Sequence, residues 1–157
     1  MTFRRLILSR SLKLAFALVL ATAAPAFAGP INEVGGIAIK GYDPVAYFTD
    51  NAAVRGSDAF TAQHEGVTYR FATAANRDAF VANPARYVPQ YGGFCAYGTA
   101  EGYKAVIDPQ AFSIVDGKLY LNYNNDIRAK WQKDVPGYII RGDKNWPAVS
   151  RTTKVHR

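Results

Sequence analysis

The alternation of apolar and polar positions along the chain predicts two β-hairpins. Residues 59–63 and 67–72 have the period-two pattern of half-buried strands, and a short polar turn separates them. Residues 112–115 and 119–123 form a second such pair around Asp116-Gly117. An Asp-Gly pair favours a type I′ turn, because both central residues of that turn need a positive φ. The chain therefore contains at least two antiparallel strand pairs.

Short helices are predicted after each hairpin. Thr73 is a good N-cap for a helix that Asn83-Pro84 ends, since proline disfavours helical geometry in the residue before it. Residues 124–132 predict a second short helix, and the glycine- and aromatic-rich stretch 91–102 predicts an irregular loop. The expected fold class is α+β, with a small antiparallel sheet or hairpins packed against short helices.

The remaining segments indicate one domain. Residues 29–36 are expected to be a loose lead-in, and residues 41–44 form a strong turn cluster. Residues 137–140 and 145–147 close the domain, and the basic tail 150–157 is expected to be frayed. No internal repeat and no linker divides the sequence further.

Residues 1–28 have the pattern of a cleavable export signal. A basic, acid-free start precedes the apolar stretch 14–20, and residues 26–28 (Ala-Phe-Ala) give the small-x-small motif that a signal peptidase needs. We expect cleavage after position 28 and release of residues 29–157 into the periplasm. The general secretory route serves such a signal, and the Arg4-Arg5 pair indicates the twin-arginine route as an alternative. The apolar stretch is too short for a transmembrane anchor, so no stable membrane anchor is expected.

The net charge changes once this signal is set apart. Residues 1–28 hold four of the 19 Lys and Arg residues and none of the 12 acids, so the remaining 15 bases leave +3 rather than +7. These bases are scattered along the chain, whereas a nucleic-acid-binding protein concentrates them on one face. We therefore expect no nucleic-acid partner.

Three segments carry a family resemblance. Residues 64–71 (HEGVTYRF), then Ala79-Phe80, then residues 83–87 (NPARY) resemble the YHS domain, whose pattern is G-x-x-Y-x-F, a short helix and N-P-x-x-Y. The match covers about residues 41–91. Residues further on, to about 147, resemble an exported bacterial subgroup of that family.

The resemblance implies a metal association, because related domains carry metal-binding cysteines. This sequence departs from that pattern, since Ala72-Thr73 and Asn76 stand where those relatives have cysteines. A closed structural zinc site needs four good ligands, and residues 29–157 contain one cysteine and two histidines. A zinc ribbon is therefore not expected.

Cys95 and His64 are the candidate metal ligands. The Cys95 thiolate suits a soft ion such as Cu(I), and its glycine-aromatic surroundings leave room for a ligand. The alternative is that Cys95 is a small buried hydrophobic residue. His64, in the first hairpin turn, completes a Cys/His pair only if that turn folds toward Cys95; otherwise it is an exposed turn residue. His156 is expected to face solvent without a role, and Asp43 to be occupied by local backbone hydrogen bonds.

Three functional hypotheses follow. The first is a non-enzymatic periplasmic YHS-type domain that binds copper or another transition-metal ion, with the coordination open or shared with an unknown periplasmic protein. The second is a metal-free module that binds a ligand or a protein. The third is a thiol-dependent redox protein that uses Cys95. No serine-hydrolase, zinc-protease or phosphate-loop motif is present, so we expect no enzyme of those classes and assign no catalytic residue.

Overall fold

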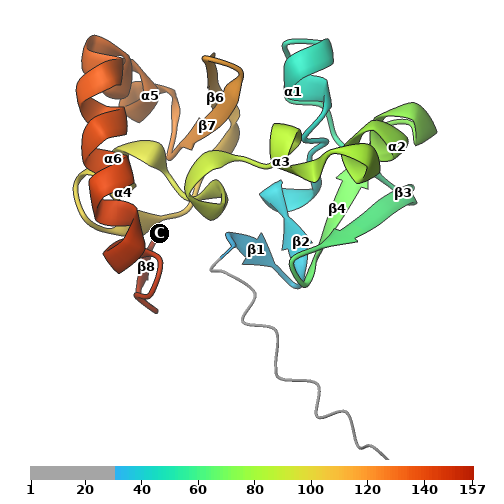
Figure 1. Cartoon of the computed structure of the whole chain (residues 1–157), viewed down its shortest axis with the longest axis horizontal. Helices are drawn as coiled ribbons and strands as arrows, with labels where there is room; N and C mark the ends of the chain where they lie inside the picture. The colour runs from blue at the N-terminus through green and yellow to red at the C-terminus, as the bar shows by residue number, and fades with distance from the viewer. Residues whose placement is uncertain (1–30) are drawn as a thin grey trace, which may run out of the picture.

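The computed structural model describes residues 31–157, which form an α+β fold (Figure 1). The expected fold class is confirmed. The predicted signal of residues 1–28 lies outside the described residues. Within residues 31–157, no helix has the length and the apolar character that a membrane crossing would require.

The N-terminal half, residues 31–87, contains one mixed sheet and short helices. Its strands lie in the order β1-β2-β4-β3, with β2 and β4 parallel and the other neighbours antiparallel. The elements in chain order are β1 (Glu33–Val34), β2 (Ile37–Ala38), η1 (Ile39–Gly41), α1 (Ala46–Thr49), β3 (Ser57–His64), β4 (Val67–Phe71), α2 (Ala74–Ala82) and α3 (Pro84–Tyr87).

The C-terminal half, residues 90–157, contains a hairpin, a small parallel strand pair and the longest helix. Strands β6 and β7 form the hairpin, and β5 pairs with β8. The elements in chain order are η2 (Gln90–Gly93), α4 (Ala96–Ala100), β5 (Lys104–Ala105), β6 (Asp108–Val115), β7 (Lys118–Asn122), α5 (Asn125–Trp131), η3 (Gln132–Asp134), α6 (Val135–Val149) and β8 (Val155–His156).

One hydrophobic core joins the two halves. Tyr47 and Phe71 of the N-terminal half belong to the same buried cluster as Leu119 and Leu121 of β7, and all four are at most 1% exposed. A second cluster, which includes Tyr91 and Tyr120, packs beneath α6. The halves therefore share a core rather than fold as two separate domains.

The local signals in the sequence are largely confirmed. The two hairpins form, the Thr73 side chain caps α2 by accepting a hydrogen bond from the backbone N–H of Asn76, and α2 ends at Asn83. Asp116 and Gly117 both have positive φ, at 49° and 70°, as the type I′ turn requires.

Two expectations about irregular segments are wrong, and one long helix was not predicted. Residues 91–102 contain the short helix α4 rather than only a loop. Residues 137–147 lie within the single 15-residue helix α6. The tail is not frayed throughout, because β8 pairs with β5 through Lys104↔Val155 and Ala105↔His156.

Candidate functional site

Cys95 lies in the C-terminal half and belongs to the buried cluster that the two halves share. It is the N-cap of α4, its backbone N–H donates to the carbonyl of Ala105 at 3.0 Å, and it forms a parallel bridge with Leu121 of β7. The residue is 1% exposed. These backbone contacts with β5 and β7 fix the position of Cys95.

The Cys95 sulfur has polar neighbours despite its burial. The backbone N–H of Gly98 donates to Sγ at 3.4 Å, and the thiol donates to Asn122 Oδ1 at 3.6 Å. Burial raises the pKa of the thiol, and backbone N–H groups of Gly98, Tyr123 and Tyr97 act in the opposite direction. The resting state is therefore a neutral thiol, beside N–H donors that stabilise a thiolate once a cation replaces the proton.

Asn122 is a second buried polar residue at this position. Its Oδ1 also accepts a hydrogen bond from the backbone N–H of Tyr97 at 3.1 Å, while its Nδ2 has no partner within the described part of the chain. The residue is 0% exposed. A buried donor without a partner costs free energy, so Asn122 is a costly polar residue beside the thiol.

A small pocket opens beside the sulfur. Its volume is about 220 Å³, and six of the residues that line it are Cys95, Tyr97, Tyr103, Tyr123, His156 and Arg157. The pocket is smaller than the roughly 300–1,000 Å³ typical of sites for drug-sized molecules. It suits an ion or a very small ligand.

The C-terminal tail brings His156 to this pocket. Lys104 is buried, and its Nζ donates to the backbone carbonyls of Ser150 at 2.9 Å and Thr152 at 2.6 Å. The His156 ring then packs on Tyr103, with 4.7 Å between the ring centroids. The side chain is exposed, as expected, but it lines the same pocket as Cys95.

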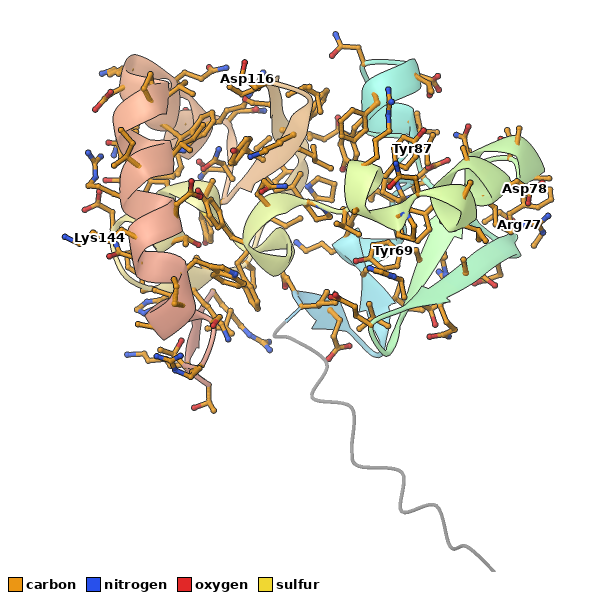
Figure 2. All side chains as sticks on the ribbon, in the orientation of Figure 1. Tyr69, Arg77, Asp78, Tyr87, Asp116 and Lys144 are labelled. Carbon is orange, nitrogen blue, oxygen red and sulfur yellow. The ribbon has the colours of Figure 1, made fainter. Side chains whose placement is uncertain are left out.

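His64 does not line this pocket. It ends β3, and its ring packs against Phe80 and Tyr69, with centroids 5.8 and 6.3 Å apart. Figure 2 labels Tyr69 in the N-terminal half, where β3 and β4 lie, whereas α4 belongs to the other half. The structure therefore does not bring His64 and Cys95 together.

The positions where the YHS resemblance would place cysteines hold a hydrogen-bond cluster instead. Asp43 is 0% exposed, and its Oδ2 accepts from the backbone N–H of Ala72 at 2.8 Å and from Asn76 Nδ2 at 2.7 Å. Its Oδ1 accepts from the backbone N–H groups of Val45 and Ala46. The carboxylate is occupied by these donors, in agreement with the structural role expected for it.

The donor set limits which metal sites fit. Within residues 31–157, no group of three or more His, Cys, Asp and Glu side chains is arranged to hold a metal ion. A closed zinc site therefore does not fit the described residues. A thiolate and an imidazole at one pocket fit an ion that accepts few, soft ligands, and Cu(I) is such an ion.

The sequence identified Cys95 but not its neighbour. His156 follows Cys95 by about 60 positions in a segment without apolar periodicity, so no motif linked the two. Comparisons with known proteins add no relative: no family model, no curated protein and no solved structure matches this chain. The YHS resemblance stays a prediction from the motifs alone.

Proposed function

We propose that this chain is a non-enzymatic binding domain for a soft transition-metal ion, with Cu(I) as the favoured ion. The protein ligands are the Cys95 thiolate and the His156 imidazole. The observation that carries the proposal is that both residues line one pocket of about 220 Å³. His64, the partner expected from the sequence, is replaced in this role by His156.

The chemistry of the pocket supports a monovalent soft ion. Thiolate and imidazole are ligands that copper accepts, and Cu(I) favours sulfur donors. The ion takes the place of the thiol proton, and the resulting thiolate is stabilised by nearby backbone N–H groups, that of Gly98 among them. With two protein ligands the ion stays open to a further ligand, which an ion-transfer partner in the periplasm would provide.

The burial of the sulfur argues against the thiol-dependent redox alternative. An activated thiol has a lowered pKa and is partly exposed, whereas burial raises the pKa of Cys95. A base within hydrogen-bond reach would be needed for nucleophilic chemistry, and within the described residues the side-chain hydrogen bonds of Sγ join it to Gly98 N and Asn122 Oδ1, neither of which is a base.

The experiment is an anaerobic competition titration of the purified protein with Cu(I) and a chromophoric Cu(I) chelator. We expect stoichiometric binding that Cys95→Ser abolishes. His156→Ala should weaken affinity by at least about tenfold, since even groups that merely orient a metal ligand are worth roughly 10–100-fold. His64→Ala is the matched control and should bind as the original chain does. Equal uptake by the original chain and Cys95→Ser would overturn the proposal.

A metal-free interaction module is the second candidate. The hydrogen bonds of Asp43 with Ala72 and Asn76 favour it, because they occupy the positions where related domains carry cysteines. This function predicts that protein purified without added metal contains none. It also predicts that a chelator leaves the melting temperature unchanged.

The proposed location is the periplasm, and it rests on the sequence of residues 1–28. N-terminal sequencing of protein recovered from a periplasmic extract tests it. The expected first residue is Gly29, and an intact N-terminus in the cytoplasmic fraction would contradict the proposal.

A further inference from the structure

Among the described residues, nothing pairs with the backbone groups along the outer edge of β6. Within residues 31–157, strand β6 belongs to a two-stranded sheet and is paired along one edge, with β7. The hairpin closes with a two-residue turn at Val115↔Lys118, which makes this pair and Ser113↔Tyr120 the hydrogen-bonded pairs. The N–H and C=O groups of the residues in between therefore point away from β7.

These outward residues are Phe112 and Ile114. Within residues 31–157, the turn, loop and side-chain hydrogen bonds use none of their backbone groups. Their side chains pack against the main core, so the strand is held in place. Unpaired N–H and C=O groups on a well-fixed strand are a template on which another extended segment can pair.

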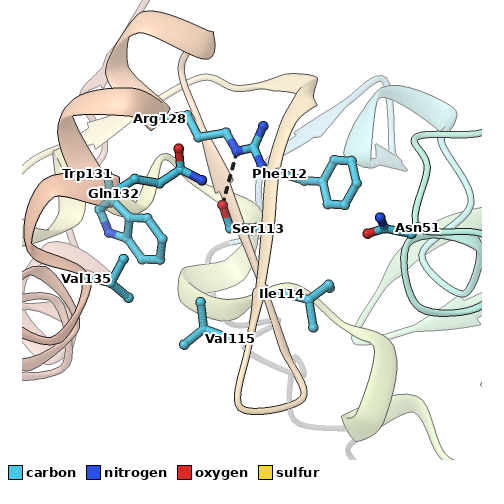
Figure 3. Close-up of a pocket in the computed structure, with 9 residues that line it drawn as sticks. All are labelled: Asn51, Phe112, Ser113, Ile114, Val115, Arg128, Trp131, Gln132 and Val135. Carbon is cyan, nitrogen blue, oxygen red and sulfur yellow. Dashed lines mark hydrogen bonds between the residues drawn. The ribbon is translucent and has the colours of Figure 1, made fainter.

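A cavity of about 480 Å³ runs along this edge (Figure 3). Figure 3 shows Phe112 and Ile114 on one side of the hairpin and Ser113 and Val115 on the other. Trp131 and Val135 complete the second side, and Asn51 lies across from the strand on the first. The cavity can thus receive side chains from both faces of an added strand.

Arg128 gives the cavity its charge. Of the described residues that line the cavity, Arg128 is the one with a charge, and its Nε donates to Ser113 Oγ at 3.1 Å. Its guanidinium carbon lies 5.8 Å from the centre of the Phe112 ring. Among the described residues, Arg128 takes part in no ion pair, so its terminal nitrogens are free to meet a carboxylate.

We propose that the β6 edge binds an extended segment of a partner protein, which pairs with Phe112 and Ile114 and places an acidic side chain on Arg128. A second copy of this chain fits less well. Antiparallel pairing of two β6 strands would bring two Arg128 side chains to the same face of the joined sheet, where like charges repel. An acidic strand instead supplies the missing opposite charge.

The probes are two short, blocked peptides of alternating Thr and Val that carry either Glu or Lys at the centre. The Val side chains of each peptide lie on the same face as its central residue, so that they can contact Val115 and Val135 of the protein. The original chain should bind the Glu peptide at least about fivefold more tightly than the Lys peptide. This ratio of affinities corresponds to the free energy of one exposed ion pair. Arg128→Glu should reverse that preference. Lys130→Glu makes the same charge change on the same helix, outside the cavity, and should keep the original preference.

Amide hydrogen exchange locates the binding. The Glu peptide should slow exchange at Phe112 and Ile114, while Ser113 and Val115, already paired with β7, change little. If neither peptide binds at millimolar concentration, the proposal is overturned. Arg128 would then be a charge that prevents other strands from pairing with this edge. Protection of the same two amides in the peptide-free protein as its concentration rises would overturn it in favour of a second copy.

Discussion

The Asn76 side chain donates a hydrogen bond of 2.7 Å to the carboxylate of Asp43, across 33 positions of sequence. The same oxygen of Asp43 accepts the backbone N–H of Ala72. The carboxylate therefore ties the turn at residues 41–44 to the end of β4 and the first turn of α2. Asp43, which accepts these hydrogen bonds, is completely buried.

Replacing Asp43 by Ala should destabilise the fold strongly. The substitution leaves several buried donors without an acceptor, and each hydrogen bond to a charged group contributes about 1.5–3 kcal/mol. We expect the free energy of unfolding in urea to fall by about 3 kcal/mol or more. Asn76→Ala removes a single donor and should cost less. A loss under about 1 kcal/mol for Asp43→Ala would show that the cluster contributes little.

Lys104→Met tests how the tail is held. Its Nζ is bonded to the carbonyls of Ser150 and Thr152, and these bonds hold the segment that carries His156. We expect faster proteolysis of residues 150–157 and a loss of about 1–3 kcal/mol in stability. If His156 ligates Cu(I), the affinity also falls, while Cys95 stays in place. Lys130→Met, at an exposed position, is the control and should behave as the original chain.

Local chemistry made much of this fold predictable. The Asp116-Gly117 turn, the Thr73 cap and the stop at Asn83 each depend on neighbouring residues only, and each is found where expected. Helix α6 was missed because its sequence contains two prolines and two glycines. Pro136 lies in the first helical turn, where a missing N–H is tolerated.

Tertiary contacts decide the features that the sequence did not predict. A Cβ atom on Gly142 of α6 would lie 2.5 Å from the Tyr91 hydroxyl oxygen, so this glycine permits close packing rather than breaking the helix. The pocket is a similar case. Cys95 was selected by its chemistry, but His156 reaches the pocket through the pairing of β5 with β8, and two-residue strands leave no periodic signal.

Gly117→Ala tests the geometry that orients the β6 edge. Gly117 has φ of 70°, and a Cβ at this position would meet no atom within 4 Å. Any loss of stability therefore reports the backbone strain of the left-handed conformation, about 1 kcal/mol. Thermal unfolding measures it. No change in stability would mean that Gly117 does not hold the left-handed conformation and that the turn is not of type I′.

The stability of the fold should depend on pH through Cys95. Because burial raises its pKa in the fold, the unfolded chain loses the thiol proton first, near the ordinary value of 9.0. The stabilisation contributed by the neutral thiol is therefore full below pH 9 and is lost as pH rises from there through the folded pKa. The stability of metal-free protein relative to Cys95→Ala should decrease above pH 9. Alkylation of the folded protein should stay slow at pH 8 and become fast in denaturant. Rapid alkylation of the native protein at neutral pH would reveal an activated thiolate and revive the redox hypothesis.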